Sequence, residues 1–165
     1  MALSALLTVS SVAHAQQPPA FADCPATAQA KHGAPRLSFD TRSRPYRTVI
    51  AQAARGPVNF AGRYILAQWG CGSGCFMAAA VDTRSGRVTS LPFSVSDWPL
   101  DVTEPLDFRA DSCLLIVRGS RNERAEHGTY FYAFDGKAFQ LRTSGSETKP
   151  WKGTSRPGHR HPAPR

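Results

Sequence analysis

The sequence lacks any apolar run that could cross a membrane. No segment of the chain approaches about 18 consecutive apolar residues, the length that a membrane-spanning helix needs. Residues 1–15 also lack any acidic or basic side chain. They form an apolar stretch followed by Ala13-His14-Ala15, which is typical of a secretory signal peptide and its cleavage site. The sequence therefore predicts an exported protein, periplasmic or secreted, whose mature chain begins at Gln16.

Catalytic motifs are missing around the unusual stretch WGCGSGC, residues 69–75. A hydrolase elbow would need glycines where Cys71 and Cys75 flank Ser73. A papain-like signature has one residue fewer between its cysteines, and a phosphate-binding loop needs a Lys-Ser/Thr pair and a following helix. Thioredoxin-type chemistry uses the spacing C-x-x-C rather than C-x-x-x-C. We therefore predict no catalytic residue and no cofactor, and the sequence leans against an enzyme.

Few cysteines are present, and all four follow the predicted cleavage site. An even number in an exported chain predicts two disulfides, for which three connectivities exist. The glycines between Cys71 and Cys75 allow a turn tight enough for a bond, and this pairing leaves Cys24 for Cys113. A thiol-redox or copper-handling role of Cys71 and Cys75 is the alternative, although the histidines are isolated and predict no metal site. Sequence alone leaves the connectivity open.

Hydrophobic periodicity predicts one helix followed by a sheet. Ser43 is placed to cap a helix in which Pro45 occupies the first turn and apolar residues recur at helical spacing. After the helix, apolar and polar residues alternate in runs that are separated by turn-forming residues. One such pair is Asp135-Gly136, which favours a two-residue hairpin turn. The expected fold class is α+β: a single domain over residues 43–144, with one N-terminal helix and an antiparallel sheet of about six strands built from hairpins. The expected strands cover residues 59–69, 76–81, 87–93, 113–118, 128–134 and 137–143.

The alternation also assigns faces to two of these strands. The first expected strand places Phe60, Tyr64 and Leu66 on one face and Trp69 on the other. Residues 113–118 form a continuous apolar run, which predicts a central strand that is buried on both faces.

Three segments show no periodicity. Residues 16–42 are expected to form a leader on the domain, and residues 94–112, with five of the twelve acidic residues, a long and mobile surface loop. Residues 145–165 are rich in Pro, Gly and charge and are expected to form a disordered basic tail. Five basic residues and one acidic residue give this tail +4 of the formal charge of +8. The tail favours a weak, salt-sensitive contact with an anionic surface, whereas nucleic acid is not an expected partner of an exported protein.

Two linked motifs stand out, N-F-A-G-x-Y at residues 59–64 and W-G-C-G-x-G-C at residues 69–75. They resemble a family of small exported bacterial proteins without an assigned function. The resemblance covers roughly residues 45–142 and implies export and a shared fold rather than a reaction. The sequence thus predicts a non-enzymatic binding or interaction module of the cell envelope with an unidentified partner or ligand. Its candidate binding residues are Arg63, Tyr64, Trp69, Ser73 and Trp98.

Overall fold

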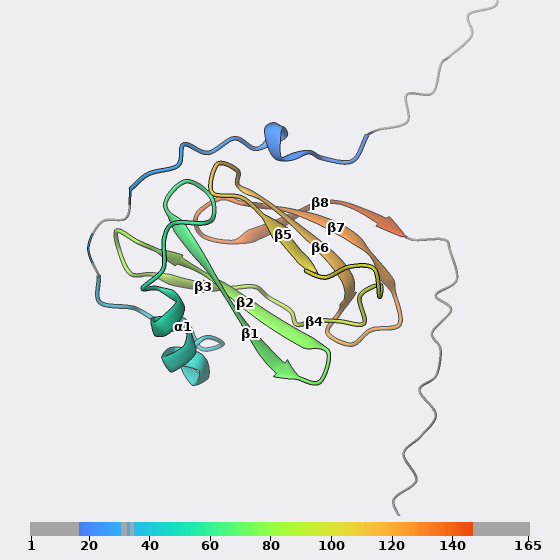
Figure 1. Ribbon diagram of the computed structural model, residues 1–165, viewed down its shortest axis with the longest axis horizontal. Coiled ribbons are helices and arrows are strands. Elements are labelled where there is room, and N and C mark those ends of the chain that lie inside the picture. The colour runs from blue at the N-terminus through green and yellow to red at the C-terminus, as the bar shows by residue number, and fades with distance from the viewer. Residues whose placement is uncertain (1–16, 31–32, 34, 147–165) are drawn as a thin grey trace, which may run out of the picture.

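The computed structural model describes residues 17–30, 33 and 35–146, and Figure 1 shows their arrangement. The predicted secretory signal and the part of the predicted tail from residue 147 onward lie outside the described residues. The elements are the 3₁₀ helices η1 (Phe21–Asp23) and η2 (Arg44–Tyr46), the α-helix α1 (Arg47–Ala53), and the strands β1 (Tyr64–Gly72), β2 (Cys75–Asp82), β3 (Val88–Ser90), β4 (Val95–Ser96), β5 (Leu106–Phe108), β6 (Leu114–Arg121), β7 (His127–Phe134) and β8 (Phe139–Ser146).

One antiparallel sheet contains all of these strands, in the order β1-β2-β4-β6-β7-β8. β3 pairs with β2, and β5 pairs with β6. The α+β class and the antiparallel sheet are confirmed, but the described sheet has eight strands instead of about six, and the helix is short. The two unexpected strands, β4 and β5, come from residues 94–112. They form because both pair with the same edge of β6, β5 near its beginning and β4 near its end.

The helix begins where the sequence predicts, but Ser43 does not cap it. Its hydroxyl donates instead to the carboxylate of Asp40, at 2.6 Å, and its backbone N–H donates to the same carboxylate oxygen, at 2.7 Å. The Ser43 hydroxyl is thus held toward Asp40, and its oxygen accepts no hydrogen bond from the first turn of the helix. Pro45 lies in the first turn, which is 3₁₀, and α-helical geometry lasts only from Arg47 to Ala53.

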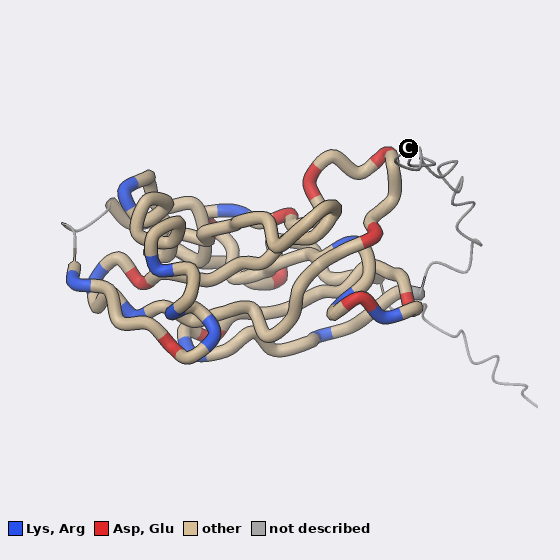
Figure 2. Tube along the Cα trace, turned by 90° about the horizontal axis from the view of Figure 1, so that it is seen from below, with Lys and Arg blue, Asp and Glu red and all other residues tan. Residues whose placement is uncertain are grey.

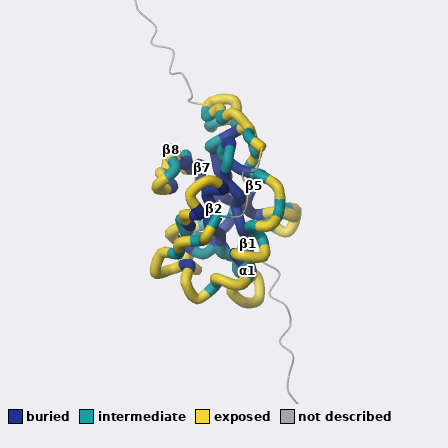
Figure 3. The backbone as a smooth tube through the Cα atoms, turned by 90° about the vertical axis from the view of Figure 1, so that its left-hand side faces the viewer, coloured by how far each residue is buried: buried dark blue, intermediate teal, exposed yellow. Residues whose placement is uncertain are grey.

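The main core lies inside the sheet, which folds over so that β1 to β3 face β5 to β8. Figure 3 shows the buried residues concentrated where β2, β5 and β7 meet. Phe60 is fully buried there, and its ring lies 5.6 Å from that of Phe134 and 6.2 Å from that of Phe139. The fully packed cluster consists of Phe60, Tyr64, Leu66, Ala78, Ala80, Leu91, Phe93, Val95, Leu106, Leu115, Val117, Tyr130, Tyr132, Phe134 and Phe139.

Each half of the sheet has a second apolar face, which another segment covers. α1 packs on the outer face of β1 and β2, where Ile65 and Trp69 are buried. η1 packs on the outer face of β6 and β7, where Phe21 contacts the cluster of Leu114 and Ile116. The predicted faces of β1 are therefore confirmed. Burial on both faces is confirmed for residues 114–117, whereas Cys113 and Arg118 at the ends of the predicted run are half-buried.

Two predicted connections differ from the structure. Residues 94–112 are docked on the sheet, since Pro105 and Leu106 are buried and β5 pairs with β6. The prediction of one long solvated loop is wrong, and the exposed remainder is the shorter segment 97–104. The β7–β8 turn has four residues instead of two, because the Asp135 carboxylate accepts hydrogen bonds from two backbone N–H groups, at 2.7 and 2.8 Å, and holds the turn open.

Candidate functional site

The predicted binding residues lie in three different places. Arg63 and Tyr64 stand at the beginning of β1, beside the β2–β3 and β7–β8 turns. Trp69 is buried on the outer face beneath α1. Ser73 lies in the turn between β1 and β2, where β2 also pairs with β4, and Trp98 follows β4. The fold therefore builds two separate surfaces at opposite ends of β1 rather than one site.

The first surface is a groove of about 500 Å³. We call it the groove, and its charged and polar walls come from Arg63, Tyr64, Asp82, Arg87, Asp135 and Lys137. Cys113 also lines it, so the groove adjoins the point where the leader is bonded to the sheet.

A paired carboxylate and guanidinium form one wall of the groove. Arg63 donates to both carboxylate oxygens of Asp82, from Nε at 3.2 Å and from Nη2 at 3.1 Å. The same Nη2 donates to the hydroxyl of Tyr64 at 3.0 Å. The two-oxygen geometry fixes the plane of the guanidinium, and through it the position of the hydroxyl.

The titration of these groups follows from their surroundings. Burial would raise the pKa of Asp82, but the hydrogen bonds from Arg63 and from the backbone N–H of Arg84 outweigh it, so the pKa lies below its usual value. Burial, and then the negative charge of Asp82, raises the pKa of the Tyr64 hydroxyl. Tyr64 therefore keeps its proton at neutral pH and can donate a hydrogen bond.

The motif N-F-A-G-x-Y folds as the corner that carries Arg63 and Tyr64. The side-chain oxygen of Asn59 accepts a hydrogen bond from the backbone N–H of Leu66 at 2.7 Å, which ties the turn to β1. Gly62 has φ +81°, and its N–H donates to the carbonyl of Ala110 at 2.7 Å. A Cβ on Gly62 would lie 2.7 Å from the carbonyl oxygen of Thr27 in the leader. Glycine is required here for both its dihedral angle and its small size.

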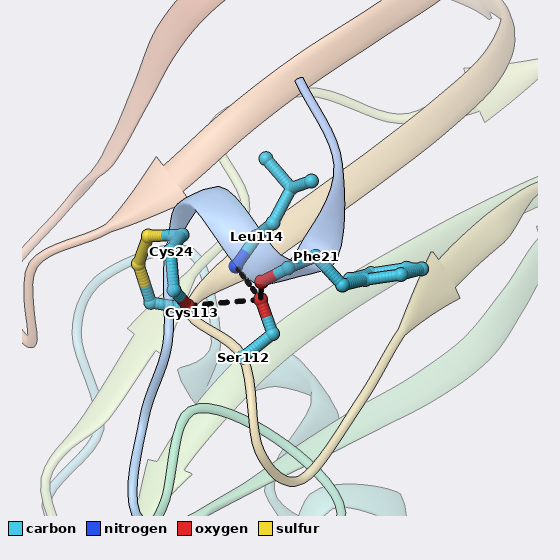
Figure 4. Close-up of a disulfide and its surroundings, with 5 residues drawn as sticks. All are labelled: Phe21, Cys24, Ser112, Cys113 and Leu114. Atoms are coloured by element: carbon cyan, nitrogen blue, oxygen red, sulfur yellow. Dashed lines mark hydrogen bonds between the residues drawn. A yellow bond between two sulfur atoms is a disulfide. The ribbon is translucent and has the colours of Figure 1, made fainter.

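The leader is held at this end by a disulfide and by hydrogen bonds. Cys24 and Cys113 are bonded, with their Cα atoms 5.3 Å apart. Figure 4 shows the buried Ser112 beside this bond, with its hydroxyl 2.9 Å from the carbonyl oxygens of both Phe21 and Cys24 and accepting from the N–H of Leu114 at 3.1 Å. These contacts connect the leader to β6 through side chain and backbone together.

Trp69 has a packing position rather than an open one. It is 7% exposed, and its ring centroid lies 5.0 Å from that of Tyr46. Its Nε1 is buried and has no hydrogen-bond partner among the described residues. The indole therefore contributes apolar area beneath the helix, and no ligand reaches it without moving η2.

The second surface lies at the other end of β1, and we call it the tip. It consists of residues 70–75 and the exposed segment 97–104. Cys71 and Cys75 are bonded, with Cα atoms 5.1 Å apart, so the structure contains both disulfides of the favoured pairing. Ser73 is exposed at the turn, and Trp98 packs against Phe76 with ring centroids 5.3 Å apart.

Sequence reasoning missed one feature of the tip and one cluster outside both surfaces. Leu100 at the tip is 87% exposed. The sequence feature that could have indicated this exposure is the position of Leu100 as an apolar residue within an acidic segment. Arg121 lies 3.8 Å from the ring centroid of Tyr130 and donates to the hydroxyl of Tyr132 at 2.7 Å. In the sequence, the two tyrosines alternate along β7, which indicates that they share one face of the strand. The pairing of strands that brings Arg121 to them cannot be read from the sequence.

Charge is distributed unequally between the two ends, as Figure 2 shows. Residues 35–55 hold five exposed arginines and one aspartate. The segment 97–104 at the tip holds three exposed acids, Asp97, Asp101 and Glu104, and no basic residue.

The described residues contain no group of three or more His, Cys, Asp or Glu side chains placed to hold a metal ion. Within the same residues, every helix is too short or too polar to cross a membrane. Comparison with known proteins finds no family model, no curated protein and no solved structure that matches the chain.

Proposed function

We propose that this protein is an exported, disulfide-containing binding module of the bacterial cell envelope, which contacts a partner protein through its tip. Export is supported by the signal-like residues 1–15 and by two disulfides, which form in oxidising compartments. The proposal includes no reaction.

The observation that carries this proposal is the exposure of Leu100 beside a rigid turn. Leu100 is 87% exposed in the segment that follows β4, and β4 pairs with the residues at the end of the turn that the Cys71–Cys75 bond closes. A rigid scaffold that presents an exposed apolar side chain on a loop is a common arrangement for protein recognition. The acids around Leu100 favour a partner with an apolar pocket and a basic rim.

A photo-crosslinking experiment tests this function. A benzophenone amino acid is placed at position 100 of the full chain, produced in its native host, and the matched control carries it at position 141. Leu141 is the other large apolar residue that is exposed in the described structure, and it lies on β8. We expect one discrete adduct from position 100 and none from position 141. Adducts of the same pattern from both positions, or none from either, contradict the proposal.

A thiol-redox function is the second candidate, because Cys71 is exposed at the tip. Thiol–disulfide exchange requires that a thiolate can reach a sulfur atom, and this bond meets that requirement. Replacing Cys75 with alanine leaves Cys71 able to hold a partner in a mixed disulfide. A stable mixed disulfide in the Cys75→Ala variant, but not in the Cys24→Ala variant, favours the redox function over simple binding.

A further inference from the structure

The groove at the other end of β1 contains positive charge that no residue of the described structure neutralises by contact. Three cationic side chains line it, from Arg63, Arg87 and Lys137, together with two carboxylates. The ligands that such a groove accepts depend on which of these charges are already in contact with one another.

Both carboxylates already accept several hydrogen bonds from the protein itself. Asp82 accepts from two nitrogens of Arg63 and from the backbone N–H of Arg84 at 2.9 Å. Asp135 accepts from two backbone N–H groups and from the side-chain amide of Gln140 at 2.6 Å. Most acceptor sites of the two carboxylates are therefore already occupied by donors of the protein.

Two of the cations have no such contact. In residues 17–30, 33 and 35–146, the side chains of Arg87 and Lys137 make no hydrogen bond and no ion pair. The ammonium group of Lys137 acts on Asp135 through its charge alone, and the guanidinium group of Arg87 acts on Tyr64 in the same way. Both remain able to donate charge-assisted hydrogen bonds to an incoming oxygen.

The floor of the groove offers a third donor. The Tyr64 hydroxyl accepts from Arg63, but its own hydrogen has no acceptor among the described residues. It lies against Gly136, where a Cβ would come within 2.9 Å of the hydroxyl oxygen. The glycine therefore lets the turn before Lys137 pack closely on the hydroxyl of Tyr64, a largely buried residue that lines the groove.

We propose that the groove binds a small organic anion through its carboxylate or phosphate oxygens, which Arg87, Lys137 and the Tyr64 hydroxyl would hold together. A volume of about 500 Å³ matches a small molecule rather than a protein segment. Two cations and a hydroxyl that line the same groove suit oxyanions, which accept several hydrogen bonds at once. This site is separate from the tip and does not depend on the function proposed there.

The test measures binding to the oxidised chain of residues 16–165 by NMR titration. The probes are inorganic phosphate and D-glucuronate, which separate the phosphate and carboxylate sources, with glucose as the uncharged control. We expect saturable shifts of the backbone N–H signals of Gly136 and Lys137 with at least one anion. The signal of Ser73 at the tip should stay unchanged, and glucose should shift none of the three.

Matched variants assign the binding to the groove. Arg87→Gln and Lys137→Gln should each weaken binding about tenfold, the effect of one charge-assisted hydrogen bond, and Tyr64→Phe about fivefold. Arg142→Gln removes the same charge from an exposed position on β8 and should leave the affinity unchanged. The variants at Arg87 and Lys137 lose no side-chain hydrogen bond or ion pair in the described structure, so their folding should not change.

Two results would overturn the site. One is the absence of saturable shifts at Gly136 and Lys137 with both anions. The other is an equal loss of affinity in Arg142→Gln and in Lys137→Gln, which would mean that the anion follows the net charge of the protein rather than the groove.

Discussion

The groove end and the tip of β1 are each closed by a disulfide, but the two bonds have different tasks. The Cys24–Cys113 bond spans 89 residues and is accompanied by the hydrogen bonds of Ser112 and by the contact of Gly62 with the leader. The Cys71–Cys75 bond spans four residues, and the glycines next to it have open space around them. The first bond connects distant segments, whereas the second shapes a turn. The same covalent chemistry should therefore contribute unequally to stability.

The largest effect is expected from removing the long-range bond. In the chain-entropy model, a loop of this length stabilises the fold by about 4.5 kcal/mol, because the bond restricts the unfolded chain. The double variant Cys24→Ala, Cys113→Ala should lose that much free energy of unfolding in urea titrations. A loss no greater than that of the Cys71 and Cys75 double variant would show that the leader is held by its other contacts.

The next effect concerns the corner at Gly62. An alanine there would combine a φ of +81° with a Cβ that lies 2.7 Å from the Thr27 carbonyl oxygen. We expect Gly62→Ala to cost about 3 kcal/mol, the sum of backbone strain and overpacking. Thermal unfolding measures it, and the control is Gly145→Ala on β8, where a Cβ would meet nothing within 4 Å. Equal midpoints for the two variants would contradict this account of the corner.

A smaller effect is expected at the tip. The double variant Cys71→Ser, Cys75→Ser removes a very short loop, so the chain-entropy model gives only about 2 kcal/mol. The measurement is again urea unfolding, beside the variant of the long-range bond. In addition, the groove signals of Gly136 and Lys137 should not shift, because the bond acts locally. Shifts there would mean that the two ends are coupled.

The smallest effect is expected from Asp82→Asn, at about 1 kcal/mol near neutral pH, because Arg63 is partly exposed and solvent weakens the ion pair. The folded-state pKa of Asp82 is lowered, so its contribution is complete above the unfolded-state pKa of about 4 and is lost as the pH falls through the folded-state pKa. The difference in unfolding free energy between wild type and variant should therefore narrow in acid. Asp101→Asn at the exposed tip is the control, and a difference that stays constant with pH would exclude the ion pair as its cause.

The faces of the strands could be predicted from the sequence, whereas the meeting of distant residues could not. Alternation placed Phe60 and Tyr64 opposite Trp69, since a strand turns successive side chains to opposite sides. β4 has two residues and β5 has three, too few for any periodicity to appear. Both form because longer strands pair with them: β6 pairs with both, and β2 also pairs with β4.

The candidate sites show the same division between local and long-range information. Gly72 and Gly74 of the W-G-C-G-x-G-C motif marked a turn correctly, because a positive φ is a local property. The strand expected over residues 59–69 was placed too early, because the chain turns at Gly62 and β1 begins only at Tyr64. Arg63 and Lys137 reach one groove because the sheet folds over, and Ser43 lost its predicted cap to Asp40 only three residues away. In each case the position of the side chain depended on a contact with another residue, which secondary-structure propensity does not describe.

The unequal distribution of charge has a consequence for orientation. Five exposed arginines in residues 35–55 and three acids in residues 97–104 give the molecule an electric dipole along its length (Figure 2). Close to an anionic surface, within a Debye length of about 8 Å at physiological salt, the charges of these two segments alone favour turning residues 35–55 toward the surface. Leu100 and the Cys71–Cys75 turn would then point away from it. A protein oriented in this way would present its tip to the surrounding compartment before any partner had touched it.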